Sequence, residues 1–158
     1  MGLEDVRDFL LVDPDTYSRN IVERNDDFEL MVFCWQSGQK SRIHDHAGSA
    51  CGVRVLSGVA TETVFERVAG SEFVRPVGVS LLHADGVTAS FDADVHQVSN
   101  DDKGGELLVT LHVYSPPLAF MNTYDAEPVT NQAGTAIGIK PDLAPPLSGS
   151  GDRAVTTR

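Results

Sequence analysis

Three histidines in two separate stretches of the chain have the spacing of a metal site. His44 and His46 lie one residue apart in RIHDHAGSACG, and His96 follows in VHQVSN about fifty residues later. Side chains alternate across a β-strand, so His44 and His46 would point to the same side and could reach one ion together. A distant strand would add His96 as a third ligand. The alternative is a pair of exposed or hydrogen-bonded histidines at a strand edge.

The segments around these histidines have the composition of short β-strands. From Tyr17 onward, runs rich in Val, Phe, Leu and Thr are separated by the turn-forming stretches QSGQ, AGS, SG, AGSE, DG and NDDKGG. This alternation predicts a small all-β barrel or sandwich. We expect strands at 17–24, 28–36, 42–46, 52–58, 60–68, 78–83, 86–91, 94–99 and 106–114, and a further one near 134–139.

The two ends of the chain differ from this central part. LEDVRDFLL has apolar residues at positions 3, 6, 9 and 10, which predicts a short helix with one apolar face that ends at DPD. The tail from Lys140 onward is rich in Pro, Gly and Ser and has little to bury, so we expect it to be flexible. The predicted organisation is one domain, with a helical segment at 1–16, a barrel at 17–139 and a tail at 140–158.

Composition and charge exclude some partners. The formal net charge is -11 and the pI is about 4.6, whereas binding to a nucleic acid backbone needs a basic face. The sequence contains no apolar run near the ~20 residues that span a bilayer, and its start lacks the basic region of a secretory signal. We therefore predict a cytoplasmic monomer without nucleic acid or membrane partners.

Two cysteines are present, and the predicted compartment gives no reason for a disulfide between them. Cys34 lies in the apolar run FELMVFCW and is predicted to be a small buried hydrophobic residue. Cys51 lies instead close to the histidine pair.

The spacing around the histidine pair resembles the first motif of the cupin superfamily. That motif has a glycine, five residues, HxH, three or four residues, a glutamate, six residues and a second glycine. Gly38, His44, His46 and Gly58 match it, but Cys51 stands where the glutamate is expected. The resemblance implies a cupin-type β-barrel, also called a double-stranded β-helix or jelly roll.

The second cupin motif ends in a histidine, three residues and an asparagine, which His96 and Asn100 match; Phe91 and Ala93 occupy its proline and glycine positions. Without the glutamate, the site has three neutral nitrogens and open coordination positions. Such a face leaves room for a chelating substrate and dioxygen on Fe(II). Zinc is the alternative, since three histidines with one open position also suit it.

With a cysteine in the glutamate position, the chain resembles the cysteine dioxygenase family of thiol dioxygenases. The resemblance runs from Tyr17 to Tyr124, and the order and spacing of several motifs carry it. These motifs are YSRN at 17–20, CW with the first histidine nine residues after Trp35 at 34–44, IHDHAGSACGVRVLSG at 43–58, HQVSN at 96–100, and LHVYSPP at 111–117. The resemblance implies a non-haem Fe(II) enzyme that oxidises L-cysteine with O2 to cysteine sulfinic acid.

The resemblance also implies roles for single residues. His44, His46 and His96 would be the iron ligands, and Arg19 would hold the carboxylate of the substrate. Tyr17 and Trp35 would line the substrate pocket.

A second group of implied roles centres on a tyrosine. Tyr114 would place its hydroxyl near the substrate and oxygen, and His112 would hydrogen-bond to it. Cys51 would form the family's thioether bond to Tyr114. The alternatives are a surface strand position for Arg19 and a core position for Tyr114; His83 matches no motif and is predicted to be structural or exposed.

Other functions remain open at this level. A 3-mercaptopropionate-type thiol dioxygenase would use the same three histidines, but the pair Arg19 and Cys51 favours cysteine. A non-catalytic metal-binding cupin would bind or sense a small ligand, and it gives no reason for a cysteine, a tyrosine and an arginine to converge. A zinc or manganese isomerase of the same fold is a third possibility.

Overall fold

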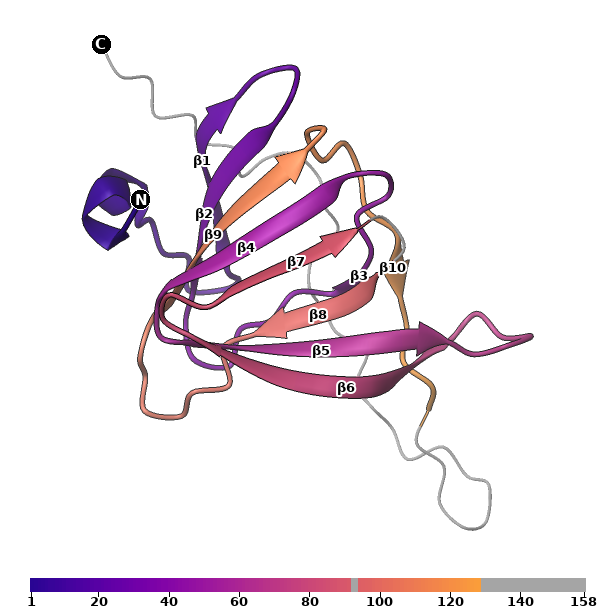
Figure 1. Ribbon diagram of the computed structural model, residues 1–158. Coiled ribbons are helices and arrows are strands. Elements are labelled where there is room, and N and C mark those ends of the chain that lie inside the picture. Colours follow the sequence, from indigo (N-terminus) through magenta and orange to yellow (C-terminus); the bar gives the residue numbers. More distant parts are fainter. Residues whose placement is uncertain (92–93, 129–158) are drawn as a thin grey trace.

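The computed structural model describes residues 1–91 and 94–128, in which ten antiparallel strands form two five-stranded sheets that face each other (Figure 1). The first sheet has the order β1 (Ser18–Arg24), β2 (Glu29–Trp35), β9 (Leu108–Ser115), β4 (Ala50–Ser57) and β7 (Val87–Phe91). The second has the order β10 (Thr123–Tyr124), β3 (Ile43–His44), β8 (Val95–Ser99), β5 (Val59–Arg67) and β6 (Val74–His83).

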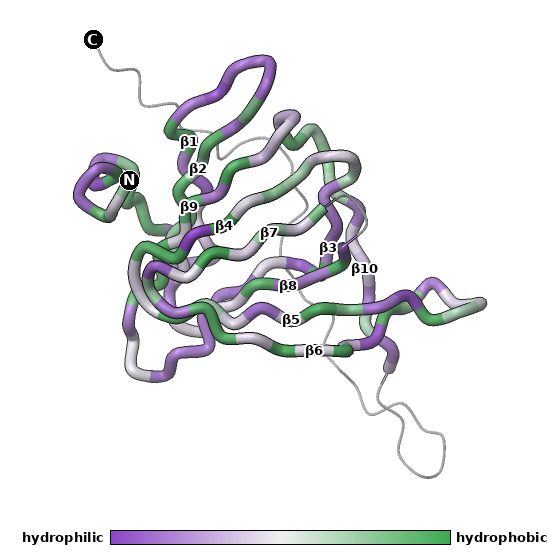
Figure 2. The backbone as a smooth tube through the Cα atoms, viewed as in Figure 1, coloured by the Kyte–Doolittle hydropathy of each residue, from purple (hydrophilic) through white to green (hydrophobic). Residues whose placement is uncertain are grey.

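The core lies between the two sheets and follows the twofold alternation of side chains along the strands. On β4, Cys51, Val53 and Val55 are buried while the residues between them are only partly so. The hydrophilic residues collect at turns such as 25–28, between β1 and β2 (Figure 2). The buried residues between the sheets are Met31, Phe33, Trp35, Cys51, Val53, Val55, Ala60, Val98, Leu108 and Tyr114.

The predicted N-terminal helix is present as a 3₁₀-helix, η1 (Leu3–Phe9). A 3₁₀-helix has three residues per turn, so apolar residues at every third position lie on one side. Val6 is fully buried at the centre of this side and packs with Val32, Cys34 and Val109 on the outer face of β2 and β9. The helix thus covers the face of the sheet that points away from the histidines.

Most predicted strands are confirmed, with three differences. β6 begins at Val74, four residues earlier than expected, and β10 was not predicted. β3 ends at His44, because the chain turns at Ala47 (φ 45°) and Gly48 (φ 100°). The expected strand near 134–139 and the tail at 140–158 lie outside the described residues.

Gly58 makes the tight turn between β4 and β5. Its φ is +80°, and a Cβ atom there would lie 3.0 Å from the Cα atom of Leu108. Glycine is the residue that adopts this backbone conformation without strain. The last glycine of the first motif therefore serves the barrel rather than the metal site.

Across 1–91 and 94–128, no helix has both the length and the apolar character to cross a membrane. The cytoplasmic location and the monomeric state stay predictions.

Candidate metal centre and substrate pocket

His44, His46 and His96 converge inside the barrel. His44 on β3 lies directly opposite His96 on β8, and His46 lies in the turn after β3. One ring nitrogen from each histidine lies within 4.8 Å of the others, and all three residues are buried. The predicted convergence of His44 and His46 is confirmed, although β3 ends at His44 and His46 lies two residues beyond it.

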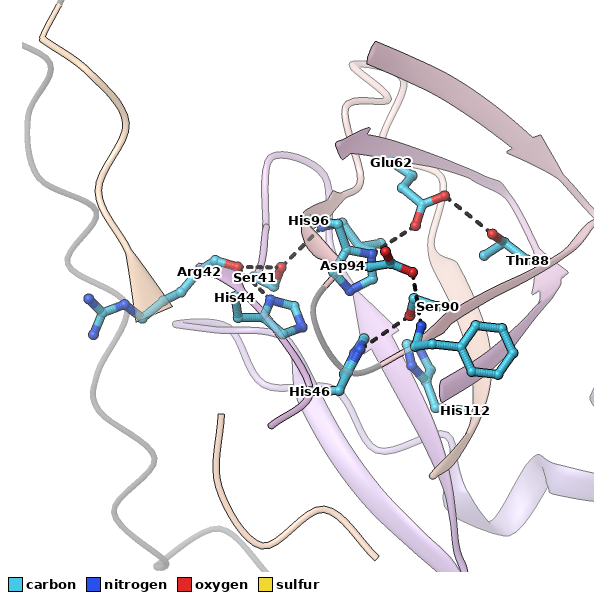
Figure 3. A network of polar contacts seen from close by, with 12 residues as sticks. Ser41, Arg42, His44, His46, Glu62, Thr88, Ser90, Asp94, His96 and His112 are labelled. Atoms are coloured by element: carbon cyan, nitrogen blue, oxygen red, sulfur yellow. Dashed lines mark hydrogen bonds and ion pairs between the residues drawn. The ribbon is translucent and has the colours of Figure 1, made fainter. Parts of the chain in front are cut away.

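The outward nitrogens of the three rings are all occupied (Figure 3). Nδ1 of His44 lies 2.8 Å from the carbonyl oxygen of Arg42. Nδ1 of His46 lies 3.2 Å from the hydroxyl of Ser90, and Nδ1 of His96 lies 2.8 Å from Oε1 of Glu62. Nε2 is then the nitrogen left to face inward, and in His96 it is buried without any hydrogen-bond partner. A buried polar atom without a partner is costly, and a metal ion would satisfy it. These residues therefore fit a metal ion.

The protonation of the rings also suits a metal. Burial, together with the nearby His96 ring, lowers the pKa of His44 to about 3 and that of His46 to about 4. Both imidazoles are neutral at pH 7 and have a lone pair to donate.

A small pocket opens beside the three histidines. Its empty space is about 310 Å³, including open solvent at its mouth. Tyr17 and Trp35 stack in its wall with their ring centroids 4.1 Å apart. The lining residues are Tyr17, Phe33, Trp35, Ser41, His44, His46, Cys51, His96, Val98, His112, Tyr114 and Met121.

Arg19, on the edge strand β1, is not among the residues that line this pocket, but it packs over Phe33, which is. Its guanidinium lies over the ring of Phe33, 5.3 Å from the centroid, and Nη2 is 4.0 Å from the sulfur of Met31. Nε is buried without a partner, and none of the described carboxylates forms an ion pair with this arginine. Burial is the main cause of the lowered pKa values of His44 and His112, and the positive charge of Arg19 adds to it.

Cys51 and Tyr114 meet on the inner face of the first sheet. They are directly opposite each other on β4 and β9, and both belong to the same buried cluster. Burial raises the pKa of Cys51 to about 12 and that of Tyr114 well above its ordinary value. Both groups are protonated at neutral pH. Cys34 and Cys51 are both free thiols, and Cys34 is buried on the opposite face of the sheet under η1.

A chain of hydrogen bonds ends at the Tyr114 hydroxyl. Trp35 Nε1 donates to the hydroxyl oxygen of Thr110 (2.9 Å), which lies 2.8 Å from Nε2 of His112. Nδ1 of His112 lies 3.2 Å from the hydroxyl of Tyr114. Trp35 can only donate, so every group is satisfied when Thr110 donates to Nε2 and Nδ1 donates to Tyr114. The proton of Tyr114 is then free to be donated into the pocket.

Thr110 was not predicted as a site residue. The signal for it was present, since Thr110, His112 and Tyr114 alternate along one strand face.

Asp45, between the two paired histidines, has a structural role that the sequence did not reveal. Its side chain accepts hydrogen bonds from the amide of Asn122 and from the hydroxyl of Tyr124. Burial favours the protonated acid, but these hydrogen bonds outweigh it and hold the pKa of Asp45 below its usual value. Asp45 thus anchors the segment that places Met121 in the pocket wall.

Two other residues singled out from the sequence lie outside the site. Asn100 donates its amide hydrogens to the carbonyl oxygens of Trp35 and Glu106, both at 2.9 Å, and so stabilises the turn after β8. His83 is exposed at the end of β6, as predicted.

The sequence matches a known family over the whole of this site. A family model described as Cysteine dioxygenase type I matches residues 3–127, about four fifths of the chain. The chain belongs to the cysteine dioxygenase family.

Individual members of the cysteine dioxygenase family agree with this assignment. Cysteine dioxygenase type 1 of Danio rerio is 37% identical over 127 residues, which are 77% of this chain and 62% of that protein. The protein of the same name from Rattus norvegicus is 33% identical over 112 residues, which are 69% of this chain and 56% of that protein. The chain thus spans about three fifths of the length of these curated relatives.

Solved structures show the same fold at lower sequence identity. A Klebsiella pneumoniae protein with a double-stranded β-helix domain superposes with a TM-score of 0.58 at 20% identity, covering 76% of this chain and 94% of that one. An RmlC-like cupin family protein from Methanocaldococcus jannaschii superposes with a TM-score of 0.51 at 12% identity, covering 66% of this chain and 84% of that one. The predicted cupin-type β-barrel is confirmed.

Proposed function

We propose that this protein is a non-haem Fe(II) thiol dioxygenase that oxidises L-cysteine with O2 to cysteine sulfinic acid. The observation that carries the proposal is the convergence of three buried histidines on a pocket whose wall residue Phe33 carries Arg19, a guanidinium without a carboxylate partner among the described residues. An anionic small molecule with a metal-binding group would satisfy both features at once. Membership of the cysteine dioxygenase family supports the same conclusion.

The three histidines would hold the iron through the inward Nε2 atoms. Bound ferrous iron would supply the redox chemistry by which both atoms of dioxygen are added to the substrate sulfur. His44 and His46 are ready to bind it at neutral pH because their pKa values are far below 7.

Arg19 would bind and orient the substrate. A guanidinium forms two parallel hydrogen bonds with a carboxylate, which a lysine does not reproduce. Held in this way, the amine and thiol of cysteine would face the histidines. Orientation of this kind lowers the entropic part of the reaction barrier.

Tyr114 would act at its hydroxyl. His112 donates to the phenol oxygen in the arrangement that satisfies every group, so the phenol proton is available to the substrate or to oxygen. Tyr17, Trp35 and Met121 would exclude bulk water from the pocket, which strengthens these polar contacts.

Cys51 and Tyr114 would also become linked. A thioether between the cysteine sulfur and the tyrosine ring replaces one S–H and one ring C–H by a C–S bond. This is a two-electron oxidation, for which dioxygen would be the oxidant and bound iron would supply the redox chemistry. The facing positions of the two residues on β4 and β9 support the proposal.

Oxygen uptake tests the function directly. The protein is reconstituted with Fe(II) without air, and O2 consumption and sulfinate formation are then followed with L-cysteine and with 3-mercaptopropionate. We expect cysteine to be the better substrate and sulfinate to match the oxygen consumed. Faster turnover of 3-mercaptopropionate would favour the other thiol dioxygenase class, and iron-loaded protein that consumes no O2 with either thiol would favour a binding or sensing cupin.

A further inference from the structure

Glu62 is a buried acidic residue that approaches the three histidines from behind. It lies on β5, opposite Val98 of the adjacent strand β8, and only 8% of its surface is exposed. Oε1 is 2.8 Å from Nδ1 of His96, and the hydroxyl of Thr88 donates to Oε2 at 3.4 Å (Figure 3). Both carboxylate oxygens therefore have a hydrogen-bonding partner, and for Oε1 that partner is His96, a candidate metal ligand.

This contact makes His96 different from the other two histidines. The Nδ1 atoms of His44 and His46 face a backbone carbonyl and a serine hydroxyl, which carry no charge. Within residues 1–91 and 94–128, His96 is the one of the three whose Nδ1 faces a carboxylate. A carboxylate that accepts the Nδ1 hydrogen fixes the tautomer and makes the opposite nitrogen a stronger donor to a metal.

The position of the charge matters because a metal-ligating imidazole is neutral. Among the described residues, the group that could hold a metal consists of the three histidines, without a carboxylate. Of the described acidic groups, Glu62 is the one that lies within hydrogen-bonding distance of a ring of this cluster. A negative charge at Glu62 stabilises a divalent metal ion held by the histidines, and it stabilises a trivalent ion more.

We propose that Glu62 is a positioning residue that supplies negative charge to the metal through His96, in place of a carboxylate bound directly to the metal. It holds the His96 ring with Nε2 inward, raises the affinity for divalent metal and stabilises ferric over ferrous iron. The proposal rests on the proposed function only in taking iron as the resident metal.

Two measurements on the whole protein test this role. Affinity for Co(II), which needs neither thiol nor oxygen, is measured by competition with a chromophoric chelator. The Fe(III)/Fe(II) potential is measured by redox titration. Glu62→Gln keeps a hydrogen-bond acceptor of the same shape and removes the charge, so we expect roughly 10- to 100-fold weaker Co(II) binding and a more positive potential. Glu62→Asp keeps the charge, so its Co(II) affinity and its potential should lie closer to those of the wild type.

Glu66→Gln is the matched control. Glu66 lies on the same strand, is exposed and pairs with Arg75, so its substitution removes one charge without touching a histidine. It should leave Co(II) affinity and potential unchanged. If Glu62→Gln has the same Co(II) affinity and the same potential as the wild type, the role of Glu62 is overturned and the proposed function stands. If the wild-type protein binds neither Co(II) nor Fe(II), both the role of Glu62 and the proposed function are overturned.

Discussion

Cys51 and Tyr114 face each other across the pairing of β4 with β9, both only 2% exposed and both in contact with the pocket beside the histidines. Opposite residues of an antiparallel pair have their Cβ atoms about 4.5–5.5 Å apart, close enough for a sulfur to reach a neighbouring ring. The sheet thus brings together two residues that are far apart in the sequence.

This pairing predicts a covalent link after turnover. Protein loaded with iron and exposed to L-cysteine and O2 should contain a fraction whose intact mass is lower by two hydrogen atoms, with a cross-linked peptide that contains Cys51 and Tyr114. On a denaturing gel this fraction should run as a second, closely spaced band. Cys51→Ser should abolish the band, and Cys34→Ala, which changes the thiol on the other face of the sheet, should keep it. An unchanged mass after many turnovers would argue against the link.

Replacement of Arg19 should damage catalysis more than metal binding. A hydrogen bond to a charged group contributes about 1.5–3 kcal/mol, so Arg19→Ala should lower kcat/KM for L-cysteine by roughly 10- to 100-fold or more. Arg19→Lys should recover little of the lost kcat/KM, since a lysine ammonium lacks the planar fork of a guanidinium. Iron content should stay near that of the wild type. Arg7→Ala, on the exposed face of η1, serves as the control. Equal losses of iron and activity in Arg19→Ala would show that the arginine supports the fold instead.

Removal of the Thr110 hydroxyl should both destabilise the barrel and lower activity. Thr110→Val preserves shape but leaves the Nε1 hydrogen of Trp35 and Nε2 of His112 buried without partners. Each unsatisfied group costs about 1–3 kcal/mol, which urea denaturation would detect. The turnover number should fall because His112 no longer holds the Tyr114 hydroxyl. Thr110→Ser should recover both properties, and a Thr110→Val protein with normal kcat would separate this hydrogen-bond chain from catalysis.

The metal-free protein should lose stability as the pH falls, at pH values well above those at which most carboxyl groups titrate. The pKa of His44 is about 3 and that of His46 about 4 in the folded state, whereas an unfolded histidine titrates near 6.5. As the pH falls below 6.5, the unfolded chain gains protons that the folded chain does not, so stability is full above 6.5 and declines toward pH 4. Each histidine contributes a slope of about 1.4 kcal/mol per pH unit.

Urea denaturation of metal-free protein between pH 7 and pH 5 measures that slope. His44→Gln should make it shallower, and His83→Gln, at an exposed position, should not. A free energy of unfolding that does not change between pH 7 and pH 5 would contradict the prediction. The same protonation should release bound metal as the pH falls.

The fold was largely predictable because its signals are local. Runs rich in Val, Phe, Leu and Thr between regularly spaced turn residues mark β1, β2, β4, β5, β7, β8 and β9 in the sequence. β10 carries no such signal, because it has only two residues and its pairing with β3 is accompanied by hydrogen bonds from Asn122 and Tyr124 to Asp45. The early start of β6 at Val74 likewise depends on contacts with distant residues, including a bridge to Ala126.

The sequence by itself determined which chemistry is available: three histidines, a cysteine in a carboxylate position, an arginine and a tyrosine, in an order typical of the cysteine dioxygenase family. Residue type and spacing are properties of the chain and are visible without coordinates. Only the tertiary structure decided which acid serves the site. Glu62 is one of 23 acidic residues, and it is singled out only by the pairing of β5 with β8, which buries it against His96. Hydrogen bonds between side chains from distant strands depend on sheet register, and register is set by packing of the whole barrel.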